Sequence, residues 1–71
     1  AQKSSGKAEK KYVEAMHLIN ASRYPEAEKA LKKLVKKEPD FARAWITLAD
    51  LQLQMSQPKE AEMAYRQAIA A

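Results

Sequence analysis

The chain has 71 residues, a formal net charge of +4 and no cysteine. This length allows one small domain, and the lack of cysteine excludes disulfides, thiolate nucleophiles and zinc–sulfur sites. No apolar run approaches the roughly 18 residues that a membrane span needs, and Ala1 to Lys11 lacks the apolar segment of a signal peptide. A signal peptide already removed would leave no trace, so export stays open beside a cytoplasmic default.

Residues 1–6 are predicted to form a disordered tail or a remnant of expression, and four helices follow. The rest of the chain is rich in Ala, Leu, Lys, Glu and Gln, which all favour helix. Breaks are predicted around Pro25, Pro39 and Pro58, because proline suits a helix's first turn and disfavours helical geometry in the residue before it. Asp40 is the expected N-cap of the third helix. The predicted helices are Lys7–Ala21, Pro25–Lys37, Phe41–Met55 and Pro58–Ala70.

The chain also resembles itself at an offset of 34 residues. Residues 8–37 align with residues 42–71 without a gap and share seven identities, where unrelated sequences would share about two. A helix–turn–helix period of this length marks one class of stacked repeat. The identical pairs are Ala8/Ala42, Ala15/Ala49, Ser22/Ser56, Glu26/Glu60, Ala27/Ala61, Glu28/Glu62 and Ala30/Ala64.

The second copy resembles the tetratricopeptide repeat pattern. It has Trp45-x-x-Leu48-Ala49, with alanine in place of the usual glycine, and then Ala61-x-x-x-Tyr65 followed by Ala68. The resemblance implies an all-α fold of two stacked helical hairpins, an α-solenoid fragment with repeats at about 8–40 and 41–71. It implies close helix crossings at the small residues, with Trp45, Leu48 and Tyr65 between the hairpins. The first copy matches at Ala15, Tyr24, Ala27, Leu31 and Pro39.

Three positions depart from the family pattern. Gln52 stands where the family usually has an aromatic residue, and Lys11 and Glu14 replace a large aromatic residue and a leucine. These two polar residues predict that the first helix begins the array. The second copy ends before its closing proline, which fits either a natural fragment or a minimal design.

No residue pattern points to catalysis, a metal or a cofactor. His17 is the only histidine, and one histidine without cysteine supplies too few ligands for a metal site. The sequence also contains no Gly-rich phosphate-binding loop. The acidic pairs Glu26/Glu28 and Glu60/Glu62 stand at helix starts, where the helix dipole favours negative charge. We therefore expect a protein that is not an enzyme.

The resemblance implies a protein-binding groove on the concave side, lined by the first helix of each repeat. Its apolar side chains suit an amphipathic or extended peptide of a partner protein. An alternative is that these residues only cover one another across the two hairpins. The lysine and asparagine that clamp chaperone tails in some family members are absent, because Tyr12 and Met16 stand there. The expected groove residues are Tyr12, Met16, Ile19, Asn20, Arg43, Ile46, Asp50, Leu53 and Gln54.

A basic stripe runs along the second helix and continues at the start of the first. It holds no aromatic residue for base stacking, so a solvated face is favoured over nucleic acid, and contact with a polyanion is the alternative. The lysines are Lys29, Lys32, Lys33, Lys36 and Lys37, with Lys7, Lys10 and Lys11.

The fourth helix has an apolar side that no later residue of the sequence covers. Met63 and Ile69 belong to it, and they predict weak self-association through the same face of a second molecule. Head-to-tail stacking is less favoured, because Lys11 and Glu14 make the first helix polar. A third possibility is a segment that serves only to pack against neighbouring repeats.

Overall fold

The protein is described here by a computed structural model of residues 6–71. Its four helices are α1 (Gly6–Asn20), α2 (Tyr24–Lys37), α3 (Ala42–Gln54) and α4 (Pro58–Ala70), which confirms the predicted all-α fold. Each end lies within one residue of its prediction. The expected tail falls outside the described residues except for Gly6, which begins α1. The N-cap of α3 is Phe41 rather than the expected Asp40.

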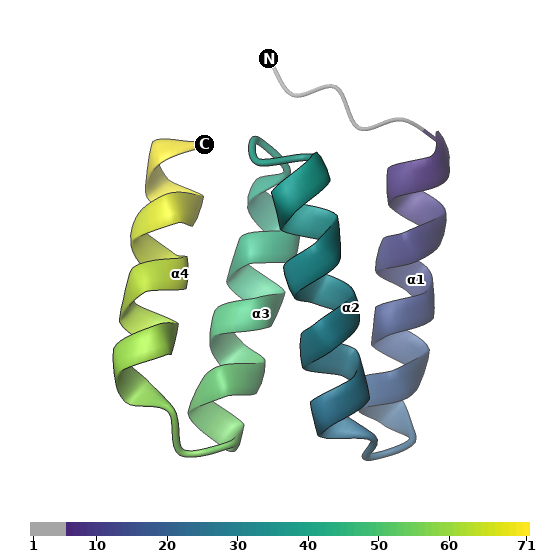
Figure 1. The fold of residues 1–71 in the computed structure, drawn as a ribbon, viewed down its shortest axis with the longest axis horizontal. Helices are drawn as coiled ribbons and strands as arrows, with labels where there is room; N and C mark the ends of the chain where they lie inside the picture. Colours follow the sequence, from purple (N-terminus) through teal and green to yellow (C-terminus); the bar gives the residue numbers. More distant parts are fainter. Residues whose placement is uncertain (1–5) are drawn as a thin grey trace.

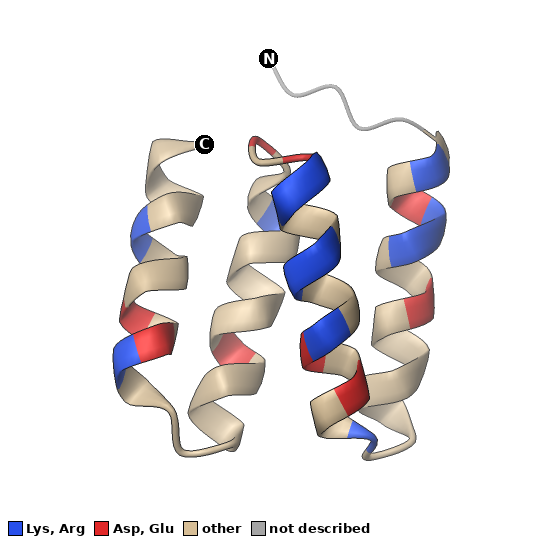
Figure 2. Cartoon of the chain, viewed as in Figure 1, with Lys and Arg blue, Asp and Glu red and all other residues tan. Residues whose placement is uncertain are grey.

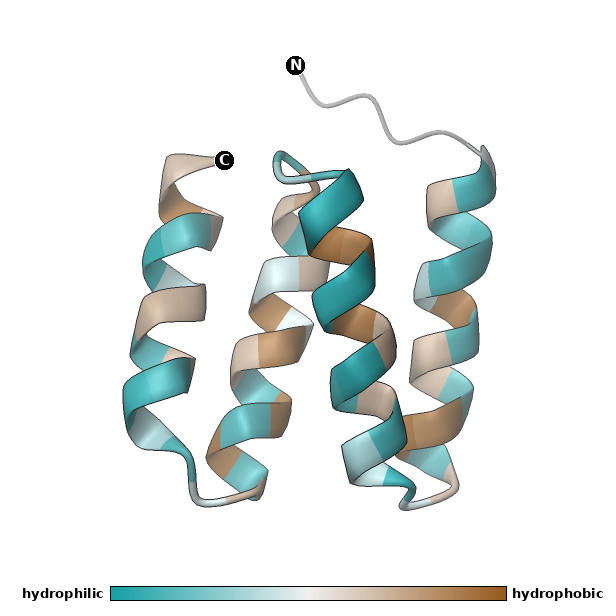
Figure 3. Ribbon diagram, in the orientation of Figure 1, coloured by the Kyte–Doolittle hydropathy of each residue, from teal (hydrophilic) through white to brown (hydrophobic). Residues whose placement is uncertain are grey.

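The helices alternate in direction and lie next to one another in the order of the sequence (Figure 1). α1 and α2 form one hairpin, α3 and α4 the other, and α2 packs against α3. Hydrophobic and hydrophilic residues alternate along α2, as a helix covered on one side requires (Figure 3).

Both hairpins turn in the same way. Ser22 and Ser56 adopt the left-handed helical backbone conformation, with φ of 61° and 59°. The residue after each serine donates a backbone hydrogen bond to the last turn of the preceding helix. The Arg23 N–H donates to the Leu18 carbonyl at 2.9 Å, and the Gln57 N–H donates to the Gln52 carbonyl at 2.8 Å. This is the Schellman ending of a helix, in which the left-handed position is usually glycine. The repeat is therefore present in the backbone as well as in the sequence.

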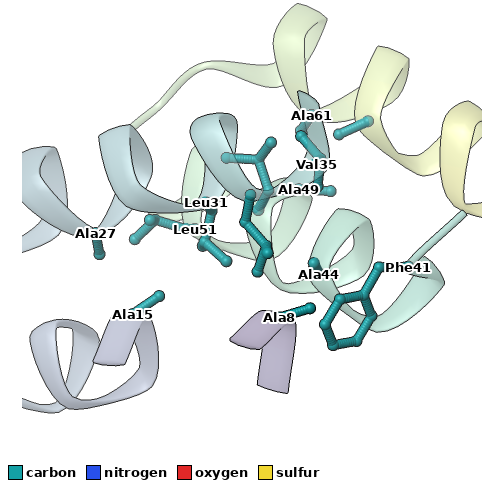
Figure 4. Close-up of a cluster of buried hydrophobic side chains, with 13 residues drawn as sticks. Ala8, Ala15, Ala27, Leu31, Val35, Phe41, Ala44, Ala49, Leu51 and Ala61 are labelled. Carbon is teal, nitrogen blue, oxygen red and sulfur yellow. The ribbon is translucent and has the colours of Figure 1, made fainter. Parts of the chain in front are cut away.

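Small residues mark the helix crossings. Ala15 and Ala27 are fully buried where α1 meets α2, and Ala49 and Ala61 are buried where α3 meets α4. Figure 4 shows Ala15 and Ala27 pointing toward each other from neighbouring helices. Without longer side chains at these positions the helix axes approach closely, as the family pattern implies.

The largest fully buried side chain between the hairpins is Phe41, with 1% of its surface exposed. Of the three residues expected here, Leu48 is buried, but Trp45 and Tyr65 are only half-buried. Phe41 immediately precedes α3, and its ring centroid lies 5.4 Å from that of Tyr12 in α1. The indole N–H of Trp45 donates instead to the Pro39 carbonyl at 2.7 Å, which holds that ring at the edge of the core.

Candidate functional site

A shallow groove runs between α1 and α3, the first helices of the two repeats, and we call it the α1–α3 groove. Its volume is about 260 Å³. Four of the expected groove residues line it, which are Met16 and Ile19 from α1 and Asp50 and Gln54 from α3. Its lining is Met16, Ile19, Tyr24, Thr47, Asp50, Leu51 and Gln54.

Tyr12 and Arg43 lie outside this lining, because they bind each other and the residues around them. The Arg43 guanidinium carbon lies 5.3 Å from the centre of the Tyr12 ring and 5.1 Å from that of Phe41. Arg43 also forms an ion pair with Glu9. The Tyr12 hydroxyl and the Thr47 hydroxyl share a hydrogen bond of 2.8 Å. These contacts join the hairpins and leave little of Tyr12 for a ligand.

The remaining expected residues are exposed. Ile46 and Leu53 lie on α3 with 44% and 50% of their surface exposed, and Asn20 ends α1. Ile46, Asp50 and Leu53 follow one another at spacings of four and three, so they share one side of α3. Asp50 lines the groove, and the exposed side chains of Ile46 and Leu53 lie beside it on α3.

Tyr65 of α4 donates a hydrogen bond to the Asp50 carboxylate. The bond and the negative charge of Asp50 favour the neutral phenol, so the pKa of Tyr65 is raised above its ordinary value of 10.0. This contact ties the second hairpin together and holds the Asp50 side chain beside the groove.

Three residues of the groove, Tyr24, Thr47 and Leu51, were not among those expected from the sequence. Tyr24 was assigned to a turn, but α2 begins with it, and its side chain reaches the groove. Thr47 stands one turn after Arg43 and three residues before Asp50, a spacing that could have placed it on the same side of α3. Leu51 is buried, so it forms the floor.

The basic stripe of α2 borders two grooves. Lys29, Lys33 and Lys37 line a groove between α1 and α2, together with Lys11. Lys32 and Lys36 line another groove, between α2 and α4. Figure 2 shows basic bands along α2 and at the start of α1. The five lysines of α2 lie within about 140° of its circumference, so they form one basic face that borders both grooves.

Met63 and Ile69 are the two most exposed large apolar residues of the described chain. They are six positions apart in the sequence, which places them about 120° apart around α4. Met63 lines the groove between α2 and α4, whereas Ile69 is not part of it. Glu62 and Arg66 form an ion pair of 3.0 Å on the same helix. Met63 and Ile69 therefore lie on different sides of α4 and do not form one apolar face.

The described residues offer no sign of two other kinds of site. No three His, Asp or Glu side chains among residues 6–71 come together as metal ligands. Over the same range, no helix has the length and apolar character that crossing a bilayer requires.

Comparison with known proteins gives the chain a family. The family model described as "Tetratricopeptide repeat" matches residues 12–71. The human and mouse proteins called "Protein O-mannosyl-transferase TMTC3" are each 35% identical over 60 residues, which cover 82% of this chain. The chain spans only 7% of the human protein and 6% of the mouse protein. No solved structure matches significantly. With its 34-residue period, paired hairpins and matching family pattern, the chain belongs to the tetratricopeptide repeat family.

Proposed function

We propose that the chain is a protein-interaction module that binds a peptide of a partner protein in the α1–α3 groove. The tetratricopeptide repeat family serves generally in protein–protein interaction, and its repeats are typically non-catalytic scaffolds. The observation that carries the proposal is that Met16, Ile19, Asp50 and Gln54, from equivalent helices of the two repeats, line one groove.

The chemistry of the groove suits a peptide. Met16 and Ile19 offer apolar surface, and Thr47, Asp50 and Gln54 offer hydrogen-bonding groups that can hold a peptide backbone. Ile46 and Leu53 extend the apolar surface along α3. A groove of about 260 Å³ is small, so we expect weak binding of a few side chains.

The proposal assigns no catalytic activity to the chain. The mannosyl-transferase named among its relatives is a far longer protein, of which this chain spans a small part. The side chains in the groove are apolar, amide, hydroxyl and carboxylate groups, and no nucleophile and base are paired there.

The test is a peptide selection followed by mapping. Peptides are selected from a random display library on the wild-type chain, and binding of the best peptide is followed by nitrogen-15 NMR. We expect amide shifts at Met16, Thr47 and Gln54. The double variant Ile46→Ser/Leu53→Ser should weaken binding by about tenfold or more, since two apolar contacts are lost.

Val13→Ser is the control, because Val13 is about as exposed as Ile46 and Leu53, at 49%, but lies beside Gly6, Lys7 and Lys10 at the start of α1. It should bind like the wild type. Equal losses in both variants, or shifts confined to α2 and α4, would contradict the α1–α3 groove.

Self-association through α4 is a second candidate, favoured by a comparison between the repeats. Ile69 is 85% exposed, whereas its counterpart one repeat earlier, Val35, is 4% exposed because α3 covers it. We propose that a second copy covers Ile69, with the two α4 helices related by a two-fold axis. In an antiparallel pair whose two-fold axis passes beside Ile69, the two Ile69 side chains cover each other.

Sedimentation over a wide concentration range tests this candidate. We expect association that Ile69→Glu abolishes and that Met63→Glu weakens less, since Met63 lies on another side of the helix. Lys59→Glu serves as a control for added negative charge on α4. A wild-type chain that stays monomeric at millimolar concentration would rule out the dimer.

A further inference from the structure

A second, larger groove lies between α2 and α4, with α3 as its floor, and we call it the α2–α4 groove. Its volume is about 520 Å³. Val35 and Ala64 form apolar walls, and Trp45 and Leu48 form the floor. Trp45 and Leu48 face this groove, whereas Asp50 and Gln54 face the α1–α3 groove, so the two lie on different sides of α3. Neither the family resemblance nor the proposed function uses it.

One polar side chain in the lining is buried, and only one end of its amide group forms a hydrogen bond. Gln52 is 3% exposed, and its side-chain Nε2 donates to the Glu28 carboxylate at 3.3 Å. A carboxylate can only accept, so this contact determines which end of the amide is the nitrogen. The other end, Oε1, has no hydrogen-bond partner among the described residues. Buried acceptors are nearly always paired, so this oxygen gains a hydrogen bond if the side chain turns outward and accepts an N–H from a ligand in the groove.

The α2 wall is basic. Lys32 and Lys36 line it, one helical turn apart, about 6 Å along the axis. Lys32 forms an ion pair of 3.4 Å with Glu28, and no ion pair to Lys36 occurs within residues 6–71. The α4 wall offers Glu60, Met63 and Gln67. A ligand that fits this groove is therefore apolar where it meets Trp45 and negatively charged where it meets α2.

We propose that the α2–α4 groove is a second binding site, and that it takes an extended peptide segment in which acidic and apolar residues alternate. In an extended chain, side chains two residues apart point to the same side at about 6.6 Å, close to the spacing of Lys32 and Lys36. The residue between two acidic side chains then points to the opposite side, toward Met63 and Ala64 of the α4 wall, while the peptide backbone runs over the floor of Trp45 and Leu48. An extended backbone also keeps free N–H groups for Gln52 Oε1, which a helix does not.

Trp45 makes the groove directly observable. It is the only tryptophan of the chain and it lines the groove, so its fluorescence reports occupancy there. The probe is a capped synthetic peptide of about nine residues with alternating glutamate and leucine, and the matched probe has glutamine in place of glutamate. We expect a saturable change in Trp45 fluorescence with the acidic probe, and binding about fivefold or more weaker with the neutral one.

Three variants locate the binding. Lys36→Glu should lower the affinity for the acidic probe by about tenfold, whereas Lys33→Glu should change that affinity by less than about twofold. Both substitutions make the same charge change on α2, but Lys33 lines the groove between α1 and α2. Gln52→Leu should lower the affinity for the acidic probe. Its melting temperature should equal or exceed that of the wild type, since the substitution removes an unpaired buried acceptor. Undiminished binding in Gln52→Leu would overturn the role of the amide.

Other outcomes would overturn the site itself. One is equal loss of binding in Lys36→Glu and Lys33→Glu, which would indicate attraction by overall charge. Another is a Trp45 response to a single-stranded RNA but not to the peptide, which would make the ligand a nucleic acid. The Ile46→Ser/Leu53→Ser variant should keep the Trp45 response, so this site and the α1–α3 groove can fail separately.

Discussion

Arg43 stands one repeat length, 34 residues, after Glu9, and the two side chains form an ion pair across the hairpins. Equivalent positions of successive repeats thus carry opposite charges and meet. Arg43 also covers the rings of Tyr12 and Phe41. The charged pair lies over the aromatic contact that joins the two repeats.

We expect Arg43→Ala to lower the free energy of unfolding by about 1 kcal/mol. Both partners are exposed, so the ion pair contributes only about 0.2–1 kcal/mol, and the contact with the two rings adds a similar amount. Arg66→Ala, which breaks the exposed pair with Glu62 on one helix, should cost about 0.3 kcal/mol. Urea unfolding measures both, and equal losses would contradict a special role for Arg43.

Phe41→Ala should be more destabilising than Trp45→Ala. Phe41 is almost fully buried, so its removal leaves a cavity and costs about 3–5 kcal/mol, enough to unfold so small a domain. Trp45 is half-buried, and its loss should cost about 2 kcal/mol. Thermal melts by circular dichroism compare the two. A folded Phe41→Ala variant beside an unfolded Trp45→Ala variant would reverse the assignment.

Ser56→Gly should stabilise the protein by about 0.5–1 kcal/mol. Ser56 has a φ of 59°, a conformation that strains a residue with a Cβ atom and does not strain glycine. Ser56→Ala keeps the Cβ atom and serves as the control, with no expected gain. Chemical denaturation of both variants decides the matter, and Ser22→Gly, at the equivalent turn, should repeat the result.

Alkaline pH should weaken the second hairpin through Tyr65. The pKa of Tyr65 is raised in the folded state above 10.0 by the bond to Asp50, so the folded state favours the neutral phenol. This contribution is fully present below pH 10 and is lost as the pH rises through the folded pKa. Unfolding measured against pH should show a smaller alkaline loss in Tyr65→Phe. Tyr24→Phe is the matched control and should follow the wild type.

Local patterns of the sequence were enough to predict most of the fold. The proline breaks located the helix ends within one residue, because helix formation depends on neighbouring residues. Ala15, Ala27, Ala49 and Ala61 were recognised as crossing points, since the repeat places small residues at equivalent sites. The α1–α3 groove was predicted in part, because its residues share one side of a helix.

The amino-acid sequence by itself determined the four helices, the repeat and the family, all of which follow from local preference and spacing. Only the tertiary structure decided which side chains are covered. It buried Phe41 more fully than Trp45, engaged Tyr12 with the second hairpin and divided the lysines of α2 between two grooves. The physical reason is that a side chain's exposure depends on the atoms packed against it, and here many of these belong to the other repeat.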